Sequence, residues 1–515
     1  MGGIVNSGRG LLPGCFLLIL MFFAYPAHAA WLRAETPHFV IYGQSNEERL
    51  RSQALLLEDY HVLLRQLTGA PDDLSPRKLE IFMVRGREQM NRIRRVGASV
   101  GGFYVADPGG MLAVADESGR EDWMSNNEIL LHEYAHHFML QHFPAAYPGW
   151  YVEGFAEYMA TARLADDTIE FGRQNLIRAS WLADRSGWLP LDRVLFGDRS
   201  RMTGAEVQKF YAQSWLTVHY LMRDAERRRH LSAYLVAVAR GDDPRASFAA
   251  IFGITASRLQ RDISAYGSSR EMTFSRATRG SARAPVEVRV TRLPAASEEL
   301  LLLRAAMSRG QYGTAPGFLA RVRREAASHA DDPFARRVLA MAEAYYGDGA
   351  TADVLLDGLL ERAPDDVELL YLKGVRYLRE GRFDEANRID LFRQAQRHFV
   401  RAHRADEDHY PTLYRYAESL SLETSFLSDN TQNVLLLAGQ LAPQVGEISL
   451  STANLLIRRG EFGRAEEMLA PLTTSAHRGR IAQTAAALLE KAQARDVTGL
   501  PPVFHVPEEA VDSED

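Results

Sequence analysis

The chain has 515 residues, enough for two to four domains of about 150 residues each. Hydrophobic residues make up 46% and charged residues 24%, which excludes a collagen-like, a disordered or a polytopic membrane chain. Its 60 basic residues stand against 66 acidic ones, and the resulting net charge of -6 argues against nucleic acid as the main partner.

The first 29 residues are predicted to be a signal peptide. Residues 15–25 form an apolar stretch too short to span a bilayer comfortably, and Ala27-His28-Ala29 has the small-x-small pattern of a signal-peptidase site. We therefore expect export, to the periplasm or outside the cell, with membrane attachment only if this segment stays uncleaved. The only cysteine, Cys15, lies within it, so the fold of the exported chain cannot depend on disulfides.

The segment that follows predicts an α+β domain over residues 30–267. An amphipathic helix is expected over residues 46–68, ended by Gly69, and a helical pattern with breaks covers residues 125–266. A small sheet followed by helices is an α+β arrangement. Strand-like runs, the last two forming a hairpin, occupy residues 38–42, 78–84, 101–105 and 111–115.

Residues 268–296 are poor in helix signals and are predicted to be a linker, with an isolated strand at 286–290. Beyond it a G-x-x-x-x-A pattern recurs with spacings of 37, 34 and 79 residues. In each unit the glycine would permit a tight turn between paired helices, and the alanine would let the second helix approach its neighbour. The four units lie at residues 310–315, 347–352, 381–386 and 460–465.

A 34-residue helix-turn-helix period resembles tetratricopeptide repeats. Residues 297–495 are therefore predicted to form an all-α helical-repeat solenoid that folds on its own and binds a protein partner. The tail at 496–515, with Pro501, Pro502 and an acidic end, is expected to be disordered.

One segment carries a pattern typical of metal chemistry, His132-Glu133-Tyr-Ala-His136. Ser125 and Glu128 form a capping box that would start a helix just before it. On a helix the two histidines project about 40° apart, one turn along the same face. Two imidazoles in that arrangement can ligate one ion, while the neighbouring Glu133 can reach a metal-bound water.

A site of this kind needs a third protein ligand, and Glu153 follows His136 after sixteen residues, enough for a second helix to return across the first. Together, the H-E-x-x-H pattern and the later Glu-Gly-Phe-Ala segment resemble the gluzincin metallopeptidases of the peptidase MA-like group. The resemblance covers residues 36–266 and implies a zincin-like fold. It also implies zinc as cofactor, with His132, His136 and Glu153 as its ligands and Glu133 as the general base.

The resemblance also suggests supporting residues. Glu157, one turn after Glu153, would orient a ligand histidine, although a solvated carboxylate is an alternative. Tyr211, 58 residues after Glu153, occupies about the place where gluzincins carry an oxyanion-stabilising Tyr or His, and His219 is its competitor. His137 faces away from the predicted ligands, so we expect it to have a packing or surface role.

In this family an edge strand binds the extended peptide by backbone pairing, and residues 111–115 are predicted to be that strand. The leading hypothesis is thus an exported zinc peptidase whose substrate is a peptide or protein. Two alternatives stay open: a repeat scaffold with a catalytically idle zinc domain, and a zinc hydrolase of a non-peptide amide or cell-wall substrate.

Overall fold

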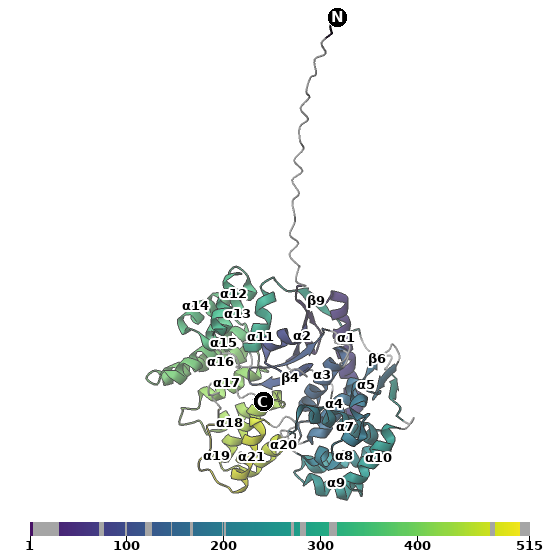
Figure 1. The fold of residues 1–515 in the computed structure, drawn as a ribbon. Helices are drawn as coiled ribbons and strands as arrows, with labels where there is room; N and C mark the ends of the chain where they lie inside the picture. Colours follow the sequence, from purple (N-terminus) through teal and green to yellow (C-terminus); the bar gives the residue numbers. More distant parts are fainter. Residues whose placement is uncertain are drawn as a thin grey trace.

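A computed structural model gives the fold of the chain (Figure 1). The structure describes residues 1–3, 30–71, 77–97, 100–118, 126–145, 147–164, 168–197, 199, 202–268, 272–278, 285–307, 317–473 and 479–504. Most of the predicted signal peptide, Ser125 of the predicted capping box and the repeat unit at 310–315 lie outside these ranges. Within them, no helix combines the length and the apolar character that crossing a membrane requires.

The described strands form two sheets, one of six strands in the order β4-β5-β3-β2-β1-β9 and one of three in the order β6-β7-β8. In the larger sheet β2, β3 and β5 are parallel, whereas β4 is antiparallel to β5 and forms one edge. The strands are β1 (Leu32–Glu35), β2 (Phe39–Gly43), β3 (Leu79–Val84), β4 (Gly102–Asp107), β5 (Gly110–Asp116), β6 (Arg163–Leu164), β7 (Thr168–Phe171), β8 (Ser275–Thr278) and β9 (Arg289–Arg292).

Most of the described chain is helical. Together with the two sheets, these helices make the molecule a mixed α+β protein. Helices among and after the strands are α1 (Glu47–Thr68), α2 (Gly86–Ile93), α3 (Asn126–His142), α4 (Gly149–Ala160), α5 (Leu176–Leu182), α6 (Leu191–Phe196), α7 (Gly204–Met222), α8 (Ala225–Ala239), α9 (Pro244–Phe252) and α10 (Ala256–Gly267), with a 3₁₀ turn at Arg185–Gly187.

The remaining helices form an arc along one side of the sheet (Figure 1). They are α11 (Ser297–Met307), α12 (Phe318–Ala327), α13 (Pro333–Tyr346), α14 (Gly349–Leu360), α15 (Val367–Phe383), α16 (Arg388–Ala405), α17 (Tyr410–Ser419), α18 (Asp429–Leu441), α19 (Gly446–Arg458), α20 (Phe462–Thr473) and α21 (Arg480–Gln493). Successive helices pack against each other, which is compatible with a helical solenoid.

Local signals in the sequence explain where the first helix begins and ends. The Asn46 side chain accepts a hydrogen bond from the backbone N–H of Arg49 at the start of α1. Gly69 ends the helix with φ +73°, a conformation that costs glycine little. The helix predicted over residues 46–68 is therefore confirmed, as are the four predicted strands within one or two residues.

Both faces of the larger sheet are buried. Alternate residues of each strand point to opposite sides, so each face packs against different helices. On β3, Ile81 and Met83 pack in the core that α1 and α3 cover. Phe82 and Val84 point to the other face, where α2 and α11 cover them. The metal motif, on α3, thus lies against the first of these faces.

Three expectations about strands are wrong. Residues 111–115 lie in β5, which pairs with β3 and β4 and is therefore an interior strand; the edge strand is β4. The predicted linker holds β8 and also β9, which is not isolated but extends the larger sheet by pairing with β1. The segment predicted to be helical after residue 125 contains β6 and β7, which are too short to leave a period in the sequence.

The repeat glycines have different roles. Gly347 caps the end of α13, and Gly460, with φ +80°, lies in the turn between α19 and α20. Gly381 instead lies inside α15, where an added Cβ would come within 2.8 Å of Phe392 on α16. There glycine serves the close approach of two helices, so the predicted turn at Gly381 is wrong.

The helical array, formed by helices α11 to α21, does not have a separate core along its whole length. Tyr410, Leu413 and Ile448 belong to the same apolar cluster as α3 and the sheet. Polar contacts cross the same boundary: Tyr410 donates from its hydroxyl to the backbone oxygen of Asp107 (3.1 Å), and Gln444 from its amide to Gln141 on α3 (2.6 Å). This continuity argues against the expectation that residues 297–495 fold on their own.

The tail predicted to be disordered is partly wrong as well. Val503 and Phe504 are buried, and Phe504 packs edge-on against Tyr414 with ring centroids 5.5 Å apart. Asn454 on α19 donates to the backbone oxygen of Pro501 (3.0 Å). Apolar packing and hydrogen bonds thus dock residues 501–504 on α17 and α19. Residues 505–515 lie outside the described residues.

Replacing Leu301 tests the shared core. Its side chain, on α11, is fully buried in the apolar cluster on the face of the sheet that α2 and α11 cover. Leu301→Ala should lower the free energy of unfolding by about 2–5 kcal/mol. Unfolding in denaturant should still show one transition, because array and sheet would unfold together. Leu437→Ala, at a leucine that is 38% exposed, is the matched control and should cost roughly 0.5 kcal/mol or less. Separate transitions by fluorescence and circular dichroism would contradict the shared core.

Candidate metal centre

Two packed helices, α3 and α4, carry the predicted ligands. His132 and His136 lie one turn apart on α3, and Glu153 lies on α4. Gly154, next to Glu153, allows α7 to approach α4, because an added Cβ would lie 2.5 Å from the backbone oxygen of Ser214. The glycine of the Glu-Gly-Phe-Ala segment thus has a packing reason: it brings α7 to the site.

The three predicted ligands meet at one point. The Nε2 atoms of His132 and His136 are 3.1 Å apart, and Glu153 Oε2 lies 3.6 Å from the first and 3.4 Å from the second. Within the described residues, these three side chains form the one group whose donor atoms could hold a metal ion. All three are buried, so the converging lone pairs need a cation among them, either a proton or a metal.

Glu157 lies behind the ligands. Its Oε1 is 3.6 Å from His132 Nδ1, the imidazole nitrogen that faces away from the other ligands. The same oxygen accepts from Arg178 (2.5 Å), and Oε2 accepts from the amide of Asn175 (3.3 Å). Because Glu157 is fully buried, the alternative of a solvated carboxylate is wrong.

Two arginines at the site carried no signal in the sequence. Arg199 donates to Glu153 Oε1 (2.7 Å), and its guanidinium lies 3.5 Å from the hydroxyl of Tyr211. Arg178, on α5, pairs with Glu157. Burial lowers the pKa of both arginines. Glu157 outweighs burial at Arg178, and Tyr211 together with Glu153 outweighs it at Arg199, so both pKa values are raised and each guanidinium stays charged. In a chain rich in arginine, no spacing rule singles these two out.

Burial and charge act in opposite directions on His132. Burial lowers the pKa of its imidazole, but Glu153, together with the charges of Glu157 and Glu133, outweighs burial and raises that pKa to about 9. Without a metal, the imidazole is therefore protonated at neutral pH. A metal ion and this proton compete for the same place.

Glu133 lies on the side of α3 that faces the edge strand β4. Its side chain is 8% exposed, and burial raises the pKa of its carboxyl above the usual value. A Cβ added at Gly102 on β4 would come within 3.1 Å of Glu133 Cγ, so strand and carboxylate are direct neighbours. No described strand pairs with the other side of β4. This edge of the sheet therefore runs beside Glu133.

The structure separates the two candidates for oxyanion donor. Two guanidiniums lie near the Tyr211 ring, with Arg178 5.1 Å and Arg199 5.7 Å from its centroid, so the ring contacts the residues that hold the two glutamates. His219 lies in the core, where Nε2 donates to the backbone oxygen of Gly172 (2.8 Å) and Nδ1 accepts from Tyr266 (2.8 Å). Burial lowers the pKa of His219 to about 4. Both of its nitrogens are engaged away from the ligands.

His137 has the packing role expected of it. Its Nδ1 pairs with the hydroxyl of Tyr104 on β4 (3.0 Å), and the imidazole is buried. Burial lowers the pKa of His137 to about 3, so the ring is neutral.

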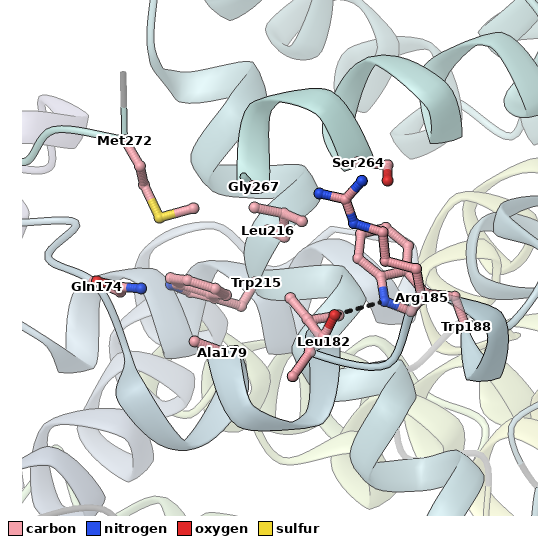
Figure 2. Close-up of a pocket in the computed structure, with 11 residues that line it drawn as sticks. Gln174, Ala179, Leu182, Arg185, Trp188, Trp215, Leu216, Ser264, Gly267 and Met272 are labelled. Carbon is pink, nitrogen blue, oxygen red and sulfur yellow. Dashed lines mark hydrogen bonds between the residues drawn. The ribbon is translucent and has the colours of Figure 1, made fainter. Parts of the chain in front are cut away.

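A small cavity of about 230 Å³ lies between α5, α7 and α10 (Figure 2). Trp188 in its wall donates from the indole N–H to the backbone oxygen of Leu182 (3.1 Å). Trp215, also in the wall, is fully buried, and none of the predicted metal ligands lines the space. This cavity adds no group to the metal centre.

Comparison with known proteins found no match for this chain among protein-family models, curated proteins or solved structures.

The pKa of His132 predicts how metal binding depends on pH. Since the imidazole is protonated below about pH 9, metal binding at pH 7 should release about one proton or more. Apparent affinity should therefore rise roughly tenfold per pH unit from pH 7 toward 9 and then level off. Calorimetric titration of Zn²⁺ into metal-free protein, in buffers of different ionisation enthalpy, measures the released proton. Binding that releases none and is equally tight at pH 7 and 9 would contradict a protonated His132.

Proposed function

We propose that the protein is an exported zinc-dependent peptidase of the gluzincin type. The observation that carries the proposal is the triangle of ligand atoms. Four-coordinate zinc with ligands at about 2.0–2.1 Å needs ligand atoms about 3.3 Å apart. The separations among His132, His136 and Glu153 are 3.1, 3.4 and 3.6 Å. Two imidazoles and a carboxylate are also a catalytic rather than a structural zinc set, because such sites leave a fourth position for water.

When bound, zinc supplies a Lewis acid that makes water nucleophilic at neutral pH. Glu133 then accepts a proton from the attacking water and returns it to the leaving amine. Its burial supports this role, since a carboxyl with a raised pKa is better able to hold a proton and give it back. A purely structural site would have no use for this buried acid.

Arg199 and Tyr211 complete the arrangement. Arg199 holds Glu153 by one oxygen, so the other oxygen stays directed at the histidines. Tyr211 donates its hydroxyl hydrogen bond to the oxyanion that develops as the carbonyl is attacked. Burial raises the pKa of Tyr211, so the phenol keeps its proton at any physiological pH.

The peptide substrate pairs with the open edge of β4. In an antiparallel ladder, backbone groups alternate between the partner strand and the open side. Asp116 N–H bonds to the oxygen of Gly101, so the alternation directs the groups of Gly102, Tyr104 and Ala106 to the open side. A peptide added there would pass beside Glu133.

The finer architecture belongs to the same proposal. Parallel strands with an antiparallel edge strand, followed by the metal-binding helices α3 and α4, would be a zincin-like domain. The helices from α11 onward would be tetratricopeptide-like and bind a protein partner or a protein substrate. Their shared core with the sheet would hold such a partner close to the catalytic domain.

Glu133→Gln is the experiment that tests the function. The amide keeps the shape of the side chain but cannot accept the proton, so cleavage of a broad peptide library should fall by about 10²- to 10⁴-fold. Zinc content and melting temperature should stay close to those of the wild type. Equal turnover by wild type and variant would contradict the mechanism. Cleavage of amide substrates other than peptides, with no peptide cleaved, would favour a non-peptide amidase, and no zinc-dependent hydrolysis at all would favour an idle domain.

The same assay applied to Tyr211→Phe tests the oxyanion donor. Turnover should fall by about 10²- to 10³-fold, the usual effect of removing one such donor, with zinc content unchanged. Tyr220→Phe, on the same helix and outside the site, is the matched control and should be fully active. If Tyr211→Phe is as active as that control, the donor lies elsewhere.

A further inference from the structure

A larger cavity, of about 440 Å³, lies away from the metal centre, where one end of the sheet meets the helical array. Its wall combines strand residues such as Tyr42 and Glu80, the β4–β5 turn at Gly109–Gly110, and side chains of α11, α13 and α15. No predicted metal ligand lines it, nor do Glu133 or Tyr211.

One wall of the cavity is apolar. It consists of side chains on α13 and α15, whose other surfaces belong to the core of the array. An apolar ligand body would find its contacts here. The apolar lining residues on these two helices are Phe334, Val338, Met341, Tyr345 and Leu372.

Other lining residues are charged, Arg337 of α13 and Glu368 of α15 among them. The cations among them are partly exposed to solvent: the side chain of Arg304 is 25% exposed and that of Lys78 is 36% exposed. Charged groups that are held by the fold yet remain accessible can receive a ligand without a large rearrangement. The cations in the lining are Arg33, Arg77, Lys78, Arg304 and Arg337.

Three of these cations each have a carboxylate of their own. Arg77 pairs with Glu368 (2.8 Å) and Arg304 with Glu80 (2.9 Å). Arg337 makes a two-pronged pair with Asp366.

The remaining two cations share one carboxylate. Glu35 accepts from Arg33 (2.7 Å) and from Lys78 (2.8 Å). The hydrogen bond from Lys78 contributes most to lowering the pKa of Glu35 to about 2. This carboxylate therefore carries one full negative charge at neutral pH. Five cations therefore face four carboxylates among the described residues, and the surplus of one positive charge lies at Arg33 and Lys78.

We propose that this cavity binds a ligand with one anionic group and an apolar body, such as a fatty acid or the carboxyl end of an apolar peptide. The anionic group takes the place beside Lys78 and Arg33, where one carboxylate serves two cations. The apolar body lies along α13 and α15. The inference is independent of the proposed peptidase activity, because it uses none of the residues of the metal centre.

Calorimetric titration of the full-length protein with decanoate tests the proposal. Decanoate should bind at one site per chain, whereas decylamine, with the opposite charge, and acetate, without the apolar body, should bind at least about tenfold more weakly. N-acetyl-leucyl-leucine and its C-terminal amide distinguish the two sources. Binding of the free acid but not the amide assigns the site to peptide carboxyl ends, and binding of decanoate without either peptide assigns it to fatty acids.

Two substitutions locate the binding. Lys78→Gln removes the surplus charge and leaves Glu35 paired with Arg33, so the fold is kept; decanoate should bind roughly three- to tenfold more weakly. Met341→Trp fills the cavity from its apolar wall and should abolish binding. Arg258→Gln, at an exposed arginine of α10, is the control for charge alone and should bind like the wild type. Decanoate binding unchanged in both Lys78→Gln and Met341→Trp, or decylamine binding as tightly as decanoate, would overturn the proposal.

Discussion

The fold around the candidate metal centre depends on burying two glutamates and two histidines between α3 and α4. Glu153 and Glu157 are both fully buried, and such charges are tolerated only when each has partners. Arg199 and Arg178 provide one guanidinium for each carboxylate, and the histidines face the remaining oxygens. The elements that carry these partners, α3, α5 and the segment at Arg199, are therefore tied to the position of α4. Loss of Arg178 or Arg199 would remove a cationic partner of one buried glutamate.

The same requirement explains how the surrounding helices are placed. Gly154 gives α7 the room to pack directly on α4, and this contact brings Tyr211 to the arginines that hold the glutamates. On the other side, Glu133 fits against Gly102 of the edge strand. A single arrangement thus places ligands, a buried acid, a phenol and an open strand edge together. The helical array adds to it by sharing the core of α3 and the sheet.

Local sequence signals predicted the local elements well. The caps at Asn46 and Gly69, the strand periods and the H-E-x-x-H spacing each act within a few residues, so the sequence displays them directly. The closeness of Glu153 to the two histidines was also predicted, because its segment has a recognisable pattern. Arg178 and Arg199 could not be found, since their partners are 21 and 46 residues away and arginine is common in this chain. The edge strand was misplaced because pairing order is a property of the whole sheet. The docked end at Phe504 was missed because two apolar residues among prolines leave no periodic signal.

Metal analysis of the purified protein tests the central claim most directly. After dialysis against buffered Zn²⁺, the wild type should hold one zinc per chain. His132→Ala and Glu153→Ala should each lose it, since either change removes one of three converging ligand atoms. His137→Gln, at the next histidine of the same helix, should retain the full amount, because that imidazole pairs with Tyr104 instead. Stoichiometric zinc in both alanine variants would contradict the assignment of the metal centre.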